Sequence, residues 1–291
     1  MNEPGAARPV RLAGPLDLAH TLQGGQAFRW RREEGDAFLG AIGARLVRLA
    51  QVGETVEAIG APRAALARYF RLEPADAQRR ERLARDPVLA PAIRALPGLR
   101  MLRQDPWETT VAFLTSANNN VPRIELIMRA LARAHGEALS EHDFAFPAPE
   151  HLARVSETRL RAAGLGYRAP FLREAARAVA RGDVDLAALR GASRDEARAS
   201  LVALPGVGPK VADCIALFAL DVDDAFPVDR WVLRAMEEAF SRAFTLKDCA
   251  GFARERWGND AGLAQQYLFH AARMRAAAPG VARVKMPPMK G

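Results

Sequence analysis

Hydrophobic and polar positions divide the chain into an amino-terminal part with the short period of strands and a longer remainder with the period of helices. Residues 27–31 alternate apolar and basic side chains, as a half-buried strand does. Further short apolar runs, separated by glycine turns, lie at residues 37–42, 46–49 and 55–59. An antiparallel, β-rich domain over residues 1–101 is therefore predicted, with one helix that begins at Pro62.

Helical spacing of apolar residues dominates from Pro106 onward. Pro122 suits the first turn of one helix, and Gly136 can end it. The expected helices cover residues 107–115, 122–136, 156–164, 168–180, 194–204, 211–220, 229–240 and 262–278. The predicted fold class is therefore α+β, with an amino-terminal antiparallel twisted β-sheet domain followed by an all-helical domain over residues 102–291.

Composition and charge narrow the function. Hydrophobic residues make up 49% and charged residues 26%, which excludes wholesale disorder. A net charge of +8 favours a polyanionic partner such as nucleic acid. Of 42 basic residues only four are lysine, so a lysine inside a motif is more informative than an arginine. The sequence contains no run of 18 consecutive apolar residues, so no membrane-spanning helix is predicted. Residues 1–11 lack the apolar segment of a secretory signal peptide. The expected location is cytoplasmic and nucleoid-associated in a bacterium, or nuclear in a eukaryote.

The most distinctive segment is Leu-Pro-Gly-Val-Gly-Pro-Lys, at residues 204–210 between two expected helices. Gly206, Val207 and Gly208 can form a tight turn whose backbone N–H groups, at the start of a helix, bind a phosphate oxygen. Because the preceding element is helical, a dinucleotide-binding turn is disfavoured. The segment predicts a helix–hairpin–helix over about residues 195–220 that grips the DNA backbone. An ordinary helix–helix turn is the alternative.

An aspartate follows this hairpin in a loop expected over residues 221–231. Asp229 comes two residues after Pro227, at the position of an N-cap. Capping alone is the simplest interpretation. A capping carboxylate is held in one orientation, however, so a catalytic role is compatible with it.

The hairpin and its aspartate resemble the helix–hairpin–helix (HhH-GPD) glycosylase superfamily, and further motifs are similar to eukaryotic-type 8-oxoguanine DNA glycosylases. The motifs, in order, lie at residues 25–30, 102–106, 116–123, 164–169, 204–229 and 262–269. Several motifs in one order are more specific than a single glycine hairpin. The resemblance implies a bifunctional DNA glycosylase/AP lyase of base excision repair. It would act as a monomer on double-stranded DNA that contains 8-oxoguanine opposite cytosine.

By this resemblance the catalytic residues are Lys210 and Asp229. Lys210 would attack the sugar C1′ and form a Schiff base, and β-elimination would follow. Burial and the dipole of the following helix are expected to lower the pKa of Lys210. Asp229 would stabilise the positive charge on the sugar and assist proton transfer. A lysine that merely contacts phosphate is the alternative.

A base inside duplex DNA must be extruded before it can be removed. The resemblance implies that Cys214 and Phe269 sandwich this base, that Gln265 binds its pairing edge and that the Gly25 carbonyl accepts its N7–H. Gln265 and Phe269 are four residues apart, so they share one helix face. Phe218 stands where the family has methionine and is expected to reshape the pocket. Taken singly, each residue is more simply explained as a core, turn or solvent-exposed residue.

Extrusion leaves the opposite cytosine unpaired. The residues that match the family's readers of this base are Asn118, Arg123, Tyr167 and Arg168. Arginine and asparagine supply donors that cytosine accepts, and tyrosine can wedge between stacked bases. The simpler interpretation of Arg168 is a solvated charge.

The chain also departs from the family. A histidine that contacts phosphate is replaced by Trp231, and its acidic partner by Ala272, so DNA contact on the 5′ side is expected to differ. The resemblance further implies a monovalent cation held by main-chain carbonyls of Val202, Leu204 and Val207. It implies no redox or organic cofactor.

Other function classes fit less well. Glycosylases for oxidised pyrimidines or mispaired adenine usually hold an iron–sulfur cluster with four cysteines, and this chain has only Cys214 and Cys249. Glycosylases for alkylated bases usually lack the lysine. A DNA-binding module that recognises lesions without chemistry, and a nucleotide-dependent oxidoreductase, remain as alternatives.

Overall fold

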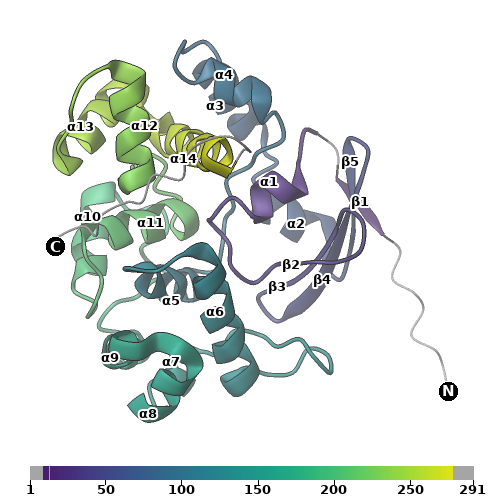
Figure 1. Ribbon diagram of the computed structural model, residues 1–291. Helices are drawn as coiled ribbons and strands as arrows, with labels where there is room; N and C mark the ends of the chain where they lie inside the picture. The colour runs from purple at the N-terminus through teal and green to yellow at the C-terminus, as the bar shows by residue number, and fades with distance from the viewer. Residues whose placement is uncertain (1–8, 13, 278–291) are drawn as a thin grey trace.

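A computed structural model describes residues 9–12 and 14–277 (Figure 1). Its sheet is antiparallel, with strand order β1-β5-β4-β3-β2. The strands are β1 (Val10–Leu12), β2 (Arg31–Arg32), β3 (Ala37–Ile42), β4 (Arg45–Val52) and β5 (Thr55–Ile59). β3 and β5 occupy their predicted ranges, and helices follow the sheet. The predicted α+β fold class is confirmed.

The prediction of a strand at residues 27–31 was wrong. Only its last residue pairs, in the short strand β2. The ring of Trp30 lies against Gly40 of β3, where a Cβ would come within 2.5 Å of the indole. The indole Nε1 donates to the Tyr69 hydroxyl over 2.9 Å. Because Trp30 packs onto the sheet, residues 27–30 lie against its face instead of extending its edge.

The helical part contains more elements than the pattern predicted. The described helices are α1 (Leu18–Leu22), α2 (Arg63–Tyr69), α3 (Pro74–Leu83), α4 (Ala90–Ala95), α5 (Pro106–Ser116), α6 (Val121–His135), α7 (Pro149–Leu152), α8 (Glu157–Leu160), α9 (Ala169–Ala180), α10 (Arg194–Val202), α11 (Pro209–Ala219), α12 (Arg230–Phe240), α13 (Leu246–Trp257) and α14 (Ala261–Ala277). The sequence pattern missed α1, α3, α4, α7 and α13. A π-helical turn, Arg161–Leu165, follows α8 and contains Gly164 at φ +100°. Ala278, the expected end of α14, lies outside the described residues.

Two hydrophobic cores support the fold. One lies under the sheet and includes Phe38, Leu49 and Phe70. The other fills the helical part, and it also takes up apolar side chains between Leu83 and Met101, ahead of the boundary expected at residue 101. α3 and α4 therefore pack against α14 (Figure 1). Within the described ranges, no helix is long and apolar enough to cross a membrane.

The segment around α1 meets α14, the last described helix. The Gln266 side chain on α14 donates to the Gly24 carbonyl over 3.2 Å. His20 of α1 and His270 of α14 join through Nδ1 and Nε2 at 3.1 Å. The loop after α1 is thereby fixed against α14 (Figure 1).

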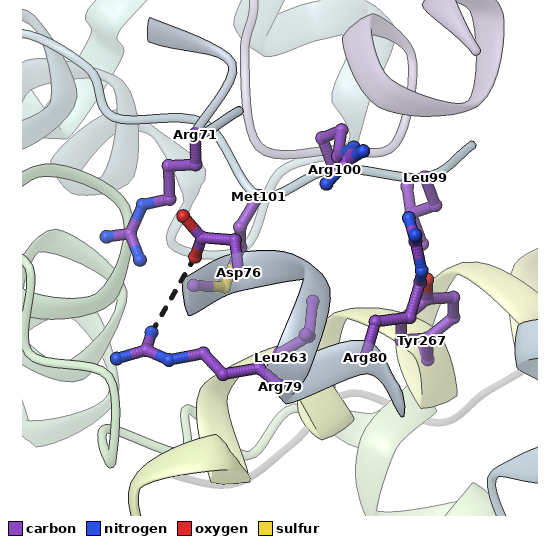
Figure 2. A pocket seen from close by; sticks show the side chains of 9 residues that line it. All are labelled: Arg71, Asp76, Arg79, Arg80, Leu99, Arg100, Met101, Leu263 and Tyr267. Carbon is purple, nitrogen blue, oxygen red and sulfur yellow. Dashed lines mark ion pairs between the residues drawn. The ribbon is translucent and has the colours of Figure 1, made fainter. Parts of the chain in front are cut away.

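Arginines also connect the first part of the chain to the loop between α11 and α12. Arg71 and Arg79 are among the side chains that line a small cavity (Figure 2). Its volume is about 10 Å³, roughly enough for one water. Arg71 is almost fully buried, and it binds Asp221 at 2.7 Å and Asp223 at 2.5 Å. Arg79 binds the other oxygen of Asp223 at 2.5 Å. This loop leads directly to Asp229, so the network fixes the approach to that residue.

Candidate active site

The predicted hairpin joins α10 to α11. Gly206 adopts φ +82°, and a Cβ there would come within 2.7 Å of the Phe171 side chain, so only glycine fits. Val207 is buried and anchors the turn. Gly208 caps α11, is exposed, and has open space where a Cβ would lie. The main chain at the start of α11 is therefore accessible to a phosphate group.

Lys210 is the second residue of α11, and its side chain is directed inward. It lies near Cys214, one turn later, and its Nζ is 5.7 Å from the centre of the Phe113 ring. Burial lowers the pKa of Lys210, but attraction by Cys214 and Asp229 outweighs burial and leaves the pKa above its ordinary value. The expected lowering was wrong for the protein without DNA. Burial raises the pKa of the Cys214 thiol to about 11, and Lys210 opposes this rise.

Asp229 caps α12 as predicted. Its Oδ1 accepts the Val232 N–H over 2.9 Å. The bond fixes the carboxylate plane and leaves its other oxygen available. No ion pair joins Asp229 to Lys210 within the described residues, yet Asp229 attracts the ammonium group. The two predicted catalytic residues thus lie near each other without neutralising each other directly.

The predicted base-binding residues converge on α14. Gln265 is 5% exposed, so it is not a solvent-exposed side chain. Its Nε2 donates to the Pro227 carbonyl over 3.2 Å, while its Oε1 is buried without a partner among the described residues. One turn later, the Phe269 ring lies against Gly25: a Cβ there, at φ +80°, would come within 2.8 Å of the ring. Gly25, Gln265 and Phe269 therefore border one site.

The Gly25 loop is held by the next residue, whose role the sequence did not reveal. Gln26 is 1% exposed, donates to the Arg100 carbonyl over 2.8 Å, and accepts the Leu102 N–H over 2.9 Å. The Gln104 side chain donates to the Gln26 carbonyl over 2.8 Å. The motifs at residues 25–30 and 102–106 therefore interlock. A glutamine between two apolar segments was the available signal.

Phe218 lies behind the pocket. Its ring stacks on Phe113 with centroids 5.5 Å apart and planes 12° apart. Phe113 in turn faces Lys210. Phe218 therefore supports the wall next to the lysine through Phe113.

The four predicted readers of the opposite base also gather at one place. Arg168 is 8% exposed and is not a solvated charge: its Nε and Nη2 donate to the Ala117 carbonyl, and its guanidinium lies 4.3 Å above the Tyr167 ring. Tyr167 is 53% exposed, and its hydroxyl accepts from the Asn118 side chain over 3.4 Å. A Cβ at Gly164, next in the chain to these residues, would come within 3.2 Å of Arg123. Together they form an exposed aromatic edge surrounded by donors.

Arg273 belongs to the same site, and the sequence did not single it out. Its guanidinium carbon lies 5.4 Å from the Phe269 ring centre, and both Asp229 and Glu125 attract it. The spacing of four residues from Phe269 was the available signal. In the described part of the chain, no cluster of three His, Cys, Asp or Glu side chains could hold a metal, and Cys214 and Cys249 are free thiols.

Two family models match the chain. One describes the 8-oxoguanine DNA glycosylase N-terminal domain and matches residues 11–110, and the other describes the HhH-GPD superfamily base excision DNA repair proteins and matches residues 111–257. N-glycosylase/DNA lyase OGG1 of Arabidopsis thaliana is 35% identical over 88% of this chain and 79% of the plant protein. N-glycosylase/DNA lyase of Saccharomyces cerevisiae is 32% identical over 75% of this chain and 67% of the yeast protein.

Solved structures agree with these matches. MBOgg1 in complex with a low-affinity DNA ligand is 35% identical, with a TM-score of 0.88 over 94% of this chain and 98% of its own. Clostridium acetobutylicum 8-oxoguanine glycosylase/lyase, bound to double-stranded DNA with cytosine opposite 8-oxoguanine, is 31% identical. Its TM-score is 0.87 over 92% of this chain and 96% of its own.

Proposed function

Because the chain belongs to the 8-oxoguanine DNA glycosylase family of the HhH-GPD superfamily, we propose that it excises 8-oxoguanine opposite cytosine from duplex DNA and then nicks the strand. It is an N-glycosylase/DNA lyase of base excision repair. The observation that carries the finer proposal is the inward-directed amine of Lys210, which faces the Phe113 ring and is attracted by Cys214 and by the Asp229 carboxylate.

Base recognition follows from the pocket's unpaired groups. The flipped base enters between Phe269 and Cys214. The pairing edge of a guanine carries N–H donors, and the Gln265 Oε1 is a buried acceptor without a partner. The Gly25 carbonyl accepts the N7–H that 8-oxoguanine has and guanine lacks. One such hydrogen bond distinguishes the two bases by about 1–3 kcal/mol.

The reaction needs the lone pair of the Lys210 Nζ. The amine attacks C1′ as the glycosidic bond breaks, and the electron pair leaves with the base, which takes up a proton. Asp229 stabilises the positive charge that develops on the sugar. The C1′–O4′ bond of the sugar then opens, O4′ takes up a proton, and C1′ and the lysine nitrogen form a protonated imine. Loss of a proton from C2′ expels the 3′ phosphate by β-elimination. Water then releases the lysine.

The raised pKa of Lys210 predicts that the reaction accelerates with pH. Below its pKa the amine carries a proton and cannot attack, so the rate of adduct formation should rise by up to tenfold per pH unit from pH 6. Cys214→Ala removes one of the two attractions that raise the pKa, so its profile should shift to lower pH. Single-turnover rates at each pH measure this. Cys249→Ala, which alters the other buried thiol, is the control and should leave the profile in place. An unshifted profile for Cys214→Ala would contradict the coupling.

Preference for cytosine is proposed to come from Asn118, Arg123, Tyr167 and Arg168. Arg168→Ala should reduce the ratio of excision rates opposite cytosine and opposite adenine by about tenfold, since it removes charged donors worth about 1.5–3 kcal/mol. A ratio is the right readout, because the loss of a buried side chain also affects stability. Arg129→Ala, an exposed arginine on α6, should leave the ratio unchanged. An unaltered ratio for Arg168→Ala would remove it as a reader.

The hairpin is also proposed to hold a monovalent cation through carbonyls of Val202, Leu204 and Val207. The Leu204 carbonyl accepts only the Val207 N–H in the described structure, so a second lone pair is available. The protein is proposed to act as a monomer, at the nucleoid in the cytoplasm of a bacterium or in the nucleus of a eukaryote. Trp231 and Ala272 stand in place of the family's histidine and acid, and neither side chain carries a charge with which to bind a phosphate.

Borohydride trapping tests the function. A duplex with one 8-oxoguanine opposite cytosine should yield a covalent adduct and a nicked strand. The undamaged duplex is the control. Excision of a different damaged base in place of 8-oxoguanine would support the alternative specificity. Binding without an adduct or a nick would support a non-catalytic lesion-binding module.

A further inference from the structure

One arginine at the base pocket forms no ion pair with any of the described residues. Arg273 lies on α14, four residues after Phe269 and eight after Gln265, so all three share one helix face. Its guanidinium carbon is 5.4 Å from the centre of the Phe269 ring. A Cβ at Gly25 would come within 3.0 Å of the Arg273 Nη1. The guanidinium therefore lies at the edge of the site that receives the flipped nucleotide.

One buried donor of Arg273 is not satisfied within the described structure. Its Nη1 is buried without a hydrogen-bond partner in the described structure, and no carboxylate of those residues forms an ion pair with it. Asp229 and Glu125 attract the charge only from farther away. Arg71 shows the contrast, because both of its terminal nitrogens bind aspartates. Arg273 is half-buried, and a charged group with a buried, unpaired donor and no ion pair is unfavourable, so its retention needs an explanation.

Packing against Phe269 does not provide that explanation. A cation over an aromatic ring is attracted through the face of the guanidinium. The five N–H donors point outward in the guanidinium plane, and the ring cannot accept them. What this arrangement lacks is an anion with oxygens arranged to accept two donors, which is what a phosphodiester supplies.

We propose that Arg273 binds a phosphodiester oxygen of the DNA strand that carries the flipped nucleotide. The inference rests on the proposed function, because the substrate brings the anion. Contact with Phe269, the ring proposed to stack on the base, restricts the phosphate to one that flanks the extruded nucleotide. A carbonyl of the base is neutral and would leave the arginine charge uncompensated. Arg273 thus holds the backbone of the target nucleotide while Gly25 and Gln265 read its base.

The test combines a protein variant with a DNA modification. Arg273→Met keeps an unbranched side chain against Phe269 and removes the charge. The probe is a duplex with a tetrahydrofuran abasic-site analogue opposite cytosine, in which the 5′ or the 3′ flanking phosphate is replaced by a neutral methylphosphonate. With unmodified DNA, Arg273→Met should weaken binding on the order of tenfold or more. One methylphosphonate should weaken wild-type binding similarly and have no further effect on Arg273→Met.

The pattern of losses decides the result. Loss of the methylphosphonate effect in Arg273→Met, at either flank, supports the contact and identifies the phosphate. Additive losses at both flanks, or wild-type affinity of Arg273→Met, overturn it. Arg275→Met is the matched control, since Arg275 is exposed on the same helix. In this variant the methylphosphonate should weaken binding as much as it does in the wild-type protein. Arg273→Lys should restore part of the affinity.

Parallel assays separate this inference from the proposed function. If the wild-type protein excises no 8-oxoguanine, the proposed function fails, and the binding measurements on the abasic-site analogue still decide whether Arg273 contacts phosphate. If excision is normal and the losses are additive, only the Arg273 inference fails.

Discussion

Lys210→Gln is expected to abolish the borohydride-trapped adduct and to lower the excision rate of 8-oxoguanine by on the order of a thousandfold or more. Glutamine fills similar space and remains polar, but it has no lone pair that can form an imine. The change removes a buried charge, so the melting temperature should not fall. Gel separation of trapped adducts and single-turnover excision measure the two effects.

Lys247→Gln is the matched control, because Lys247 is an exposed lysine on α13. It should form the adduct at the wild-type rate. An adduct that persists in Lys210→Gln would assign the chemistry to another amine. Normal excision by Lys210→Gln, with the adduct lost, would mean that water and not lysine displaces the base.

Gly25→Ala is expected to lower kcat/KM for 8-oxoguanine by on the order of a hundredfold. The residue has φ +80°, which strains alanine, and the new Cβ would lie 2.8 Å from the Phe269 ring. Displacement of the loop would separate the carbonyl from the N7–H of the base and would disturb the ring that stacks on it. Together these losses amount to about 2–4 kcal/mol.

Gly43→Ala separates backbone strain from the loss of pocket geometry. Gly43 has φ +59° in the turn between β3 and β4, and a Cβ there would meet nothing within 4 Å. It should lower the melting temperature slightly and leave kcat/KM unchanged. Equal losses of kcat/KM in both variants would show that Gly25 acts only through stability.

The sequence predicted the parts of the site that depend on local chemistry. A glycine hairpin between helices, an N-cap aspartate after proline, and a helix with residues at four-residue spacing can each be read directly from the chain. β1 and α3 could not be read in this way, because three residues show no period and the ten residues of α3 bury little apolar surface. The strand expected at residues 27–31 failed because a long-range contact, Trp30 on Gly40, decided its conformation.

Long-range contacts also explain what the sequence left out of the site. Gln26 positions the Gly25 loop through Arg100, Leu102 and Gln104, some 75 residues away in the chain. The pKa of Lys210 rises because Cys214 and Asp229 attract its charge, and no local sequence pattern shows that Asp229 lies near enough to do so. Likewise, Arg273 stands out only in the structure, where its Nη1 has no hydrogen-bond partner among the described residues.

Because the loop after α1 packs against α14, the base pocket forms only after α14 has been synthesised. Gly25 emerges from the ribosome early, whereas Phe269 is made about 240 residues later, and the pocket needs both. A nascent chain, or a fragment that stops before α14, has no place for a flipped base, because α14 supplies both Gln265 and Phe269. Recognition of the lesion is therefore the last property that this chain acquires as it is synthesised and folds.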